Sequence, residues 1–356
     1  MKYLCAHRWA FNAWGGTLQE QEDALVPATG HEVTLRITHC GMCHSDIHIR
    51  EGGFDMGGGK LSSLERAGVK FPVTMGHEIV GEVVEIGPDV TTLSIGMMVV
   101  AYPWLGCGAC AVCERGDEHL CVKAARNLGL QVPGGYADAL RISHERYLVP
   151  IGTLEPARAA TFACAGITAL GAIRKLPALG ADDYVVIIGC GGVGMTGVAL
   201  LSATSKVKIV AIDPDPVKRE AALAHGASLA FDPGMPDALK TISKTCAGNI
   251  AAAIDFVGSE SSSTLAVGLV RRTGLVVIVG LFGGEFKMPL PMFALKSITI
   301  TGSYVGGLND LRELVALAQR ETLPQIPLDL RAMASVNEAL DDLIHGRVVG
   351  RVVLQP

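Results

Sequence analysis

The second half of the chain alternates short apolar runs with helical segments, and this alternation constrains the fold more than any other feature. From about Asp183 onward, six runs are uncharged or nearly so, at 185–189, 208–213, 228–232, 252–258, 275–280 and 297–303. Parallel strands that are covered by helices on both faces have this composition. We therefore predict an α/β fold with a doubly wound, six-stranded parallel sheet.

A glycine-rich turn joins the first of these runs to an apolar helix over 195–203. Its glycines permit a tight turn and a close backbone approach to a pyrophosphate, whose charge meets the helix N-terminus. The second run ends in an aspartate, where a carboxylate accepts from a ribose 2′-hydroxyl and repels a 2′-phosphate. These features predict a Rossmann site that prefers NAD over NADP, formed by Gly189, Gly191, Gly192, Gly194 and Asp213. Lys218 and Arg219 lie close enough in sequence to weaken that preference, and a glycine-rich turn without a ligand is the alternative.

The first 150 residues have a different texture, with short alternating runs divided by glycine and proline turns. This pattern predicts irregular, mostly antiparallel β structure. Beyond the six strands we expect helices over 311–320 and 336–345 and a last strand over 350–354. The glycine-rich segment 52–59 predicts a mobile loop, and such loops often lie beside binding sites.

Length and charge limit the classes of protein and partner. A chain of 356 residues fits two domains better than one core. It carries 30 basic against 35 acidic residues and no basic block, which disfavours nucleic acid and membrane surfaces as partners. The N-terminus lacks an apolar signal core, and the uncharged stretch 185–205 is rich in glycine, which favours strand, turn and helix over a membrane span. We expect a cytoplasmic protein with a small-molecule ligand, no nucleic-acid partner and no membrane partner.

Four cysteines with the spacing C-x2-C-x2-C-x7-C lie in one short lobe: Cys107, Cys110, Cys113 and Cys121. Four thiolates close a tetrahedral shell and leave no position for water, so they predict a structural zinc site. An iron–sulfur cluster is the alternative, but its ligand run ends in Cys-Pro, whereas Val122 follows here. Cysteines held by metal also suit a reducing compartment better than a disulfide framework.

A second group of metal-binding residue types lies in the first half, in Cys43-His44-Ser45-Asp46-Ile47-His48 and Gly76-His77-Glu78. A catalytic zinc keeps three protein ligands and one open position, and a Cys2His set would need another cysteine. Cys164 is the candidate, because its apolar segment 159–172 joins the two halves; taken alone, it also fits a buried packing residue. We expect only packing roles for Cys5, Cys40, Cys190 and Cys246.

These motifs together resemble the zinc-dependent alcohol dehydrogenases of the medium-chain dehydrogenase/reductase family. The likeness runs nearly end to end through C-H-S-D-x-H, G-H-E, the four-cysteine lobe, C-A-G-I-T and G-x-G-G-x-G, in that order. The resemblance implies a GroES-like, mostly antiparallel catalytic domain at 1–165 and 302–356 and a Rossmann NAD-binding domain at 166–301. It also implies two zinc ions per chain, with Cys43, His77 and Cys164 as the catalytic ligands.

The resemblance assigns further roles in the same site. Ser45 and His48 resemble the proton relay, Asp46 the carboxylate that orients the histidine ligand, and Glu78 the acidic neighbour of the metal. His44 resembles a contact to the cofactor pyrophosphate, and Thr168 a contact to the nicotinamide side. Lys218 resembles a contact to the adenosine ribose, and Arg351 a contact to the phosphate. Trp104 resembles a wall of the substrate pocket. The insertion 52–69 is similar to that of prokaryotic tetrameric members, so we expect a homo-oligomer, a tetramer rather than a dimer.

The resulting hypothesis is an NAD-dependent dehydrogenase that interconverts apolar or aromatic, primary or secondary alcohols and their aldehydes or ketones. One alternative is a non-catalytic zinc- and nucleotide-binding redox sensor, which has no need of the Ser45/His48 relay. Another is a zinc-free enone or quinone reductase on the same fold. Such a reductase should lack the set Cys43, His77 and Cys164.

Overall fold

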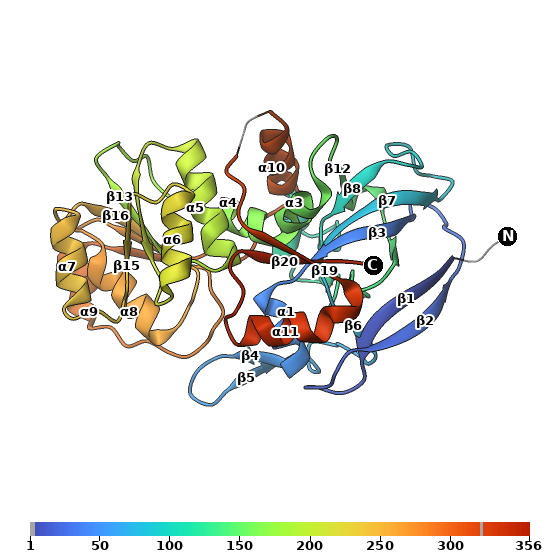
Figure 1. Ribbon diagram of the computed structural model, residues 1–356, viewed down its shortest axis with the longest axis horizontal. Helices are drawn as coiled ribbons and strands as arrows, with labels where there is room; N and C mark the ends of the chain where they lie inside the picture. The colour runs from blue at the N-terminus through green and yellow to red at the C-terminus, as the bar shows by residue number, and fades with distance from the viewer. Residues whose placement is uncertain (1–3, 321–322) are drawn as a thin grey trace.

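A computed structural model describes residues 4–320 and 323–356. Its most regular feature is a six-stranded, all-parallel sheet at one end of the molecule (Figure 1), in the order β15-β14-β13-β16-β17-β18. The strands are β13 (Tyr184–Ile188), β14 (Lys208–Ile212), β15 (Leu229–Phe231), β16 (Ile250–Asp255), β17 (Leu275–Ile278) and β18 (Thr299–Gly302). All six predicted strands are therefore confirmed.

Helices cover both faces of this sheet because its strands are apolar on both sides. Val185 and Ile187 of β13 belong to a buried cluster with α5 (Gly192–Thr204) and α6 (Pro216–Ala224). Val186 and Ile188 point the other way, into a cluster with α7 (Ala238–Thr245) and α8 (Glu260–Leu269). The doubly wound α/β fold is confirmed, and the stretch 185–205 forms strand, turn and helix as predicted.

The other end of the molecule contains a seven-stranded sheet in the order β12-β8-β7-β3-β20-β19, with β11 also paired to β3. Its pairs are antiparallel except for β19 with β20. The strands are β3 (Val33–Gly41), β7 (Glu78–Ile86), β8 (Met98–Ala101), β11 (Ala139–Ile142), β12 (Leu148–Pro150), β19 (Leu328–Ala332) and β20 (Arg351–Gln355). The mostly antiparallel character predicted for this half is confirmed.

Small sheets and several helices complete this half. One sheet joins β2 (Gln19–Leu25), β1 (Leu4–Phe11) and β6 (Val73–Thr74), and another joins β9 (Trp104–Leu105) and β10 (Arg126–Asn127). The helices are α1 (His44–Glu51), α2 (Ala111–Glu114), α10 (Leu308–Arg320) and α11 (Val336–Ile344). Part of the predicted loop at 52–59 is instead a strand, β4 (Gly53–Asp55), which pairs with β5 (Leu61–Ser63), and residues 56–59 lie in the turn between them.

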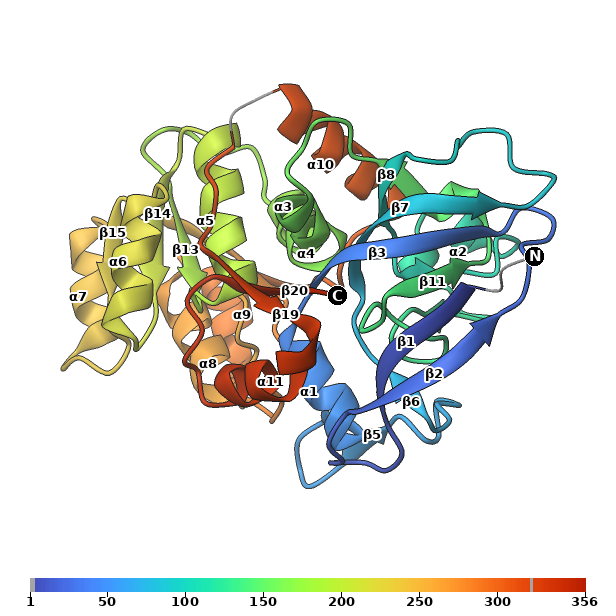
Figure 2. The ribbon, with the colours of Figure 1, turned by 45° about the vertical axis from the view of Figure 1, so that its right-hand side comes forward.

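An apolar helical run connects the two halves, and Figure 2 shows it between the parallel sheet and β3. It contains α3 (Pro156–Thr161), a π-helical turn (Phe162–Gly166) and α4 (Ile167–Ile173). The run is long and apolar enough to cross a membrane, yet 72% of it is buried inside the protein, as in a core helix. Cys40, Cys190 and Cys246 are buried as expected of packing residues, whereas the side chain of Cys5 lies outside the described part.

Candidate active site

A cavity of about 380 Å³ lies between the two halves of the molecule. Helix α1 and the strand β9 contribute one wall, and the glycine-rich turn with the loop after β17 contributes the other. Most of the lining side chains are apolar. The polar groups that reach the cavity include Cys43, His44, Ser45, His48, His77, Cys164 and Thr168.

Three of these residues come from distant segments and meet as a set that could hold a metal ion. Cys43 lies at the N-terminus of α1, His77 just before β7, and Cys164 in the π-helical turn. One ligand atom from each lies within 4.8 Å of the other two, and all three side chains are buried. The Cys43 and Cys164 sulfurs are 3.9 Å apart. Two thiolates and an imidazole that also line a cavity fit a zinc ion with an open position.

Asp46 contacts two of these three residues, His77 and Cys43. One of its carboxylate oxygens lies 3.3 Å from His77 Nδ1, which leaves Nε2 of the ring for a metal. The other oxygen accepts hydrogen bonds from the Cys43 backbone N–H and the Tyr136 hydroxyl, both at 2.9 Å. Asp46 is fully buried, so these partners fix its position. Tyr136 was not predicted, because nothing in sequence spacing connects it to α1.

Glu78 and Arg351 form a buried ion pair beside the metal ligands. The second Glu78 oxygen accepts from the Ala165 backbone N–H at 3.1 Å, one residue after Cys164. Burial raises the pKa of Glu78 to about 7, against the opposing charge of Arg351. Arg351 also packs against Gly192, where a side chain would overlap its Cδ atom. The pair therefore connects the metal ligands to the glycine-rich turn.

Helix α1 carries the polar groups of the proposed proton path. The Ser45 hydroxyl lies 3.7 Å from the Cys43 sulfur, and His48 lies one turn further along the helix. Burial lowers the pKa of His48, so its imidazole is neutral at neutral pH. The His44 and His48 ring centroids are 5.3 Å apart, and His44 stacks on Phe282 of the other half at 4.9 Å.

The glycine-rich turn has the geometry of a phosphate-binding turn. Gly189 has a φ of +86°, and a side chain on Gly194 would overlap the Gly189 carbonyl oxygen. Gly191 precedes α5, and a side chain there would meet nothing within 4 Å. A turn that requires glycine at 189 and 194 therefore presents an open surface at the N-terminus of α5.

Asp213 lies at the end of β14, buried beside this turn. Its carboxylate accepts from the Cys190 N–H at 2.7 Å and the Asp215 N–H at 2.9 Å. Arg219 donates to the Asp213 carbonyl at 2.7 Å, whereas Lys218 lies 3.4 Å from the Gly346 carbonyl oxygen. The cationic residue next to Asp213 is thus Arg219.

Two further residues face the space between the turn and the metal ligands. The Thr168 hydroxyl is buried, and the structure gives it no hydrogen-bond partner. Such an orphaned polar atom on a cavity wall suits a ligand group that can hydrogen-bond to it. Trp104 is buried against the cavity, with its ring centroid 6.2 Å from that of His77.

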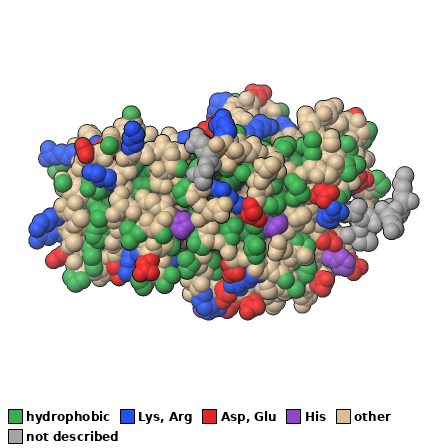
Figure 3. All heavy atoms as spheres, turned by 45° about the horizontal axis from the view of Figure 1, so that its top comes forward, with side chains coloured by type: hydrophobic (Ala, Val, Ile, Leu, Met, Phe, Trp, Pro, Cys, Tyr) green, Lys and Arg blue, Asp and Glu red, His purple; other side chains and the backbone are tan. Residues whose placement is uncertain are grey.

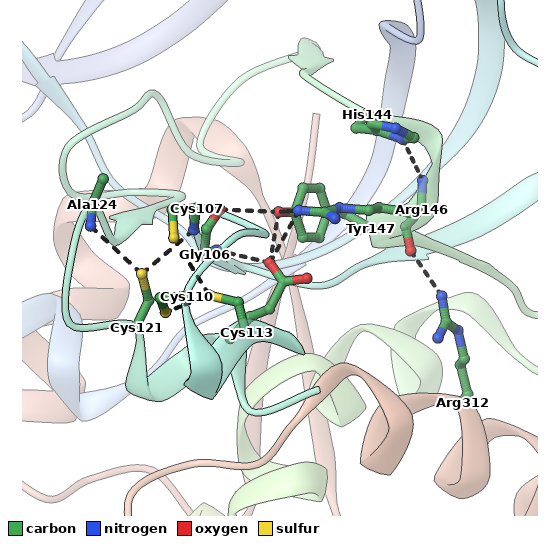
Figure 4. Close-up of polar contacts among 11 residues, drawn as sticks. Gly106, Cys107, Cys110, Cys113, Cys121, Ala124, His144, Arg146, Tyr147 and Arg312 are labelled. Carbon is green, nitrogen blue, oxygen red and sulfur yellow. Dashed lines mark hydrogen bonds and ion pairs between the residues drawn. The ribbon is translucent and has the colours of Figure 1, made fainter. Parts of the chain in front are cut away.

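The four cysteines of the lobe also come together, and Figure 4 shows their sulfurs converging beside a polar network. Their ligand atoms all lie within 4.8 Å of one another. Burial opposes ionisation, but backbone N–H groups from Ala124, Cys107 and Lys123 lower the pKa of Cys121 to about 6. Four converging sulfurs fit a closed tetrahedral zinc site.

Glu118 supports this lobe through hydrogen bonds. Its carboxylate accepts from the Gly106 N–H at 2.9 Å and from the Tyr147 hydroxyl at 2.7 Å. Arg146 pairs with the same carboxylate at 3.3 Å, and its backbone carbonyl accepts from Arg312 of α10 (Figure 4). Sequence analysis missed this network because its members lie on separate turns and strands.

Comparisons with known proteins agree with this geometry. Residues 29–153 match the model of the alcohol dehydrogenase GroES-like domain, and residues 192–320 match the zinc-binding dehydrogenase model. An NAD-dependent alcohol dehydrogenase of Sulfurisphaera tokodaii is 34% identical over 94% of this chain and 96% of its own length. An alcohol dehydrogenase of Geobacillus stearothermophilus is 34% identical over 95% and 96% of the two chains.

A solved structure gives the same result. The crystal structure of the alcohol dehydrogenase from Aeropyrum pernix has a TM-score of 0.88 and 30% identity, and the match covers 98% of this chain and 100% of that one. The chain therefore belongs to the zinc-dependent alcohol dehydrogenases of the medium-chain dehydrogenase/reductase family. The family resemblance read from the sequence is confirmed, and the chain is an oxidoreductase.

Proposed function

We propose that this enzyme interconverts apolar or aromatic, primary or secondary alcohols and the matching aldehydes or ketones, with NAD as the hydride carrier. The observation that carries the proposal is the convergence of Cys43, His77 and Cys164 on the wall of an interdomain cavity that also reaches the glycine-rich turn. Metal ligands and a dinucleotide turn on one cavity place the two halves of a hydride-transfer site together.

Each chain would hold two zinc ions, one at Cys43, His77 and Cys164 and one in the four-cysteine lobe. The first is a Lewis acid that makes an alcohol easier to deprotonate and polarises a carbonyl group. The second ties the lobe together and takes no part in the reaction. Asp46 orients His77, and the Glu78–Arg351 pair balances charge behind the ligands.

The chain's own residues would then move the alcohol proton outward. Ser45 lies beside Cys43, and its hydroxyl can take that proton while it releases its own toward His48. His48, neutral because burial lowers its pKa, receives the proton at its ring nitrogen and passes it to solvent. Burial in the cavity keeps bulk water away from the reacting carbon.

The cofactor would lie along the glycine-rich turn with its pyrophosphate at the N-terminus of α5. We assign Gly189, Gly191, Gly192 and Gly194 to this contact, with the His44 and Arg351 side chains as its neighbours. Thr168 faces the nicotinamide side, and Asp213 the adenosine ribose. The carboxylate favours NAD, while Lys218 and Arg219 beside it limit the discrimination against NADP.

Apolar lining favours apolar substrates. Trp104, Leu128, Leu130 and Tyr304 line the cavity beside the metal ligands, and Asn127 is a rare polar group among them. A pocket of this kind binds the hydrocarbon part of an alcohol and offers little to a polyol. Asn127 and Tyr304 were not predicted, because they reach the pocket from strand ends with no motif.

We also propose the domain limits 1–165 with 302–356 and 166–301, a cytoplasmic location, and a homotetramer. The pairing of β20 with β3 supports these domain limits, because it returns the end of the chain to the sheet of the first domain. Acidic and basic side chains are interspersed on the face shown in Figure 3, which supports the absence of nucleic-acid and membrane partners. Within the described residues β18 pairs with β17 alone and is therefore an edge strand, and the nearby α9 (Leu290–Lys296) has no buried residue. An open strand edge beside an exposed helix supports a subunit interface here.

The two alternatives fit the geometry less well. A zinc-free reductase has no use for two buried thiols and an imidazole whose ligand atoms lie within 4.8 Å of one another. A sensor without catalysis has no use for Ser45 and His48 on the cavity wall.

The test is metal analysis of the purified protein, followed by NAD⁺ and NADP⁺ reduction with primary, secondary and benzylic alcohols and with polyols. We expect about two zinc ions per chain, faster turnover with NAD⁺, and a preference for apolar alcohols. Zinc in the lobe alone, or reduction of an enone with no alcohol oxidation, would refute the proposal.

A further inference from the structure

Two glycine-rich loops from opposite halves of the molecule meet at the cavity. One is the turn of the β4–β5 hairpin, where Gly57, Gly58 and Gly59 all have left-handed φ angles, from +57° to +78°. The other is the loop after β17, where Gly283 and Gly284 have φ angles of +98° and +94°. We call residues 53–63 and 281–285 together the clasp.

Backbone contact between the loops depends on the missing side chains. A Cβ atom on Gly283 would lie 2.6 Å from Cβ and 2.7 Å from the carbonyl oxygen of Asp55, closer than van der Waals contact allows. A Cβ atom on Gly57 would lie 2.9 Å from the carbonyl carbon of Gly284 and would overlap the Glu285 side chain. Glycine at both positions therefore lets the two halves touch along the main chain.

Not every glycine of the clasp is needed for this contact. Gly59 and Gly284 share the left-handed backbone conformation, yet a side chain on either would meet nothing within 4 Å. Their backbone strain on substitution should match that of Gly57 and Gly283, because all four have positive φ angles. Gly59 and Gly284 therefore serve as control positions for Gly57 and Gly283.

The clasp also places apolar side chains on the cavity wall. Phe54 and Met56 reach it from the hairpin, and Leu281 and Phe282 from the opposite loop. Phe54 lies 5.1 Å from the His48 ring, and Phe282 lies 4.9 Å from the His44 ring, measured between centroids. A row of four rings, two from the clasp and two from α1, therefore crosses from one half to the other.

These apolar side chains are poorly covered by the protein itself. Met56 is 59% exposed and Phe282 is 57% exposed, although both line a cavity. Large apolar groups that are exposed together at a cavity gain free energy when an apolar ligand covers them. The wall made by the clasp thus suits the hydrocarbon part of a substrate rather than water.

We propose that the clasp determines substrate specificity: its glycine contacts hold Phe54 and Met56 against the cavity, where they bind the part of an alcohol that lies farthest from the metal ligands. The ligand class is a bulky apolar or aromatic alcohol. This inference rests on the proposed alcohol dehydrogenase function. Gly57 and Gly283 are positioning residues, since neither has a side chain that could touch substrate.

The first experiment compares Gly283→Ala with Gly284→Ala, and Gly57→Ala with Gly59→Ala, in NAD⁺-dependent oxidation of 1-phenylethanol and 2-propanol. Gly283→Ala and Gly57→Ala should lower the ratio of kcat/KM for 1-phenylethanol to that for 2-propanol by about tenfold, through a higher KM for the aromatic alcohol. The control variants should keep the wild-type ratio. Equal ratios within each pair would overturn the proposal.

A second pair keeps the test valid if a glycine variant fails to fold. Met56 and Leu61 are similarly exposed residues of the same hairpin, at 59% and 57%, but only Met56 lines the cavity. Met56→Ala should lower the same ratio several-fold, and Leu61→Ala should leave it unchanged. An unchanged ratio in both variants, or an equal decrease in both, would contradict the assignment of Met56 to the substrate-binding wall.

Failure of this inference is distinguishable from failure of the proposed function. A wild-type enzyme that oxidises neither alcohol with NAD⁺ overturns the proposed function, and the clasp assignment with it. A wild-type enzyme that oxidises both, with variants that match their controls, overturns the clasp assignment alone.

Discussion

At the scale of single residues, the proposed proton path depends on His48. Its pKa is lowered mainly by burial, with Glu51 and Cys43 opposing, so the ring is neutral at pH 7 and can accept a proton. As the pH falls through a value below the ordinary histidine pKa of about 6.5, protonation removes this acceptor and activity should decline. A pH profile of kcat/KM measures this limb directly.

His48→Gln should slow turnover and remove that acid limb, because glutamine does not titrate. Its zinc content should equal that of the wild type, since His48 is not among the metal ligands. An unchanged acid limb would assign the titration to another group, and loss of zinc would make His48 a ligand.

Tyr136 is the residue whose importance only the structure reveals. Its buried hydroxyl donates to Asp46 at 2.9 Å, and Asp46 in turn lies against His77. Tyr136→Phe should weaken zinc binding at the three-ligand site about tenfold or more, because such supporting hydrogen bonds orient the ligands. Competition with a chelator measures the affinity.

Tyr102→Phe is the matched control for this prediction. Tyr102 is also a buried tyrosine, but its hydroxyl donates to the Gly306 carbonyl at 2.9 Å and not to Asp46. Both variants should lose about 1–3 kcal/mol of folding free energy, but only Tyr136→Phe should release zinc more readily. Equal zinc affinity in the two variants would show that Asp46 does not need the tyrosine.

The metal-binding residue types were predictable at this scale, whereas their supporting contacts were not. Cys43, His77 and the lobe cysteines stand in short motifs, so local spacing identifies them. Cys164 was only a candidate from its position at the join of the halves, and the family resemblance was needed to assign it, because the π-helical turn that aims it has no sequence signal. Tyr136 comes from a segment 90 residues away from Asp46, and tertiary packing alone brings them together.

At the scale of elements, the turn between β13 and α5 separates two roles of glycine. A side chain on Gly194 would overlap the Gly189 carbonyl, so Gly194→Ala should lower the free energy of unfolding by about 1–3 kcal/mol. A side chain on Gly191 meets no protein atom within 4 Å but occupies the surface proposed for the pyrophosphate. Gly191→Ala should therefore keep the melting temperature and weaken NADH binding.

Thermal unfolding and NADH fluorescence titration measure the two effects separately. Full NADH affinity in Gly191→Ala would move the pyrophosphate away from this turn. A melting temperature for Gly194→Ala equal to that of the wild type would show that the turn relaxes at no cost.

Elements with a local signal were predictable, and those set by distant partners were not. The apolar strands of the parallel sheet and the glycine turn were predicted because both faces of the sheet are buried and the turn is contiguous. The segment 52–59 was predicted as a loop because glycines usually break strands, yet β4 pairs with β5 there. Strand β19 was missed, since its partner β20 lies further along the chain.

At the scale of the whole molecule, the proposed tetramer would use β18 and α9. Leu290 and Leu295 of α9 are 79% and 71% exposed, and the Lys296 ammonium group donates to carbonyls at the end of α8 instead of protecting the edge. An uncharged edge strand beside exposed leucines invites pairing with a second copy. Leu295→Glu should therefore reduce the particle mass from a tetramer to a smaller species, as measured by light scattering.

Val122→Glu is the control, since Val122 is 78% exposed but lies next to the four-cysteine lobe. It should leave the particle mass unchanged. A tetramer in both variants would exclude α9 from the interface, and a monomeric wild type would refute the oligomer itself.

The order of the two halves was predictable from texture and motifs, but the contacts that join them around the predicted site were not. Local pattern separates the two halves, because the antiparallel half alternates apolar and polar residues whereas the buried parallel strands are apolar runs. The contact of Arg351 with Glu78 and Gly192 depends on the chain returning from its C-terminus to β3. No local pattern encodes that return.

The zinc content of Cys43→Ala, measured together with its activity and NADH affinity, tests the central claim most directly. We predict about one zinc ion per chain in place of two, loss of alcohol oxidation, and NADH binding equal to that of the wild type. Full alcohol oxidation by a variant that has lost this zinc would contradict the account.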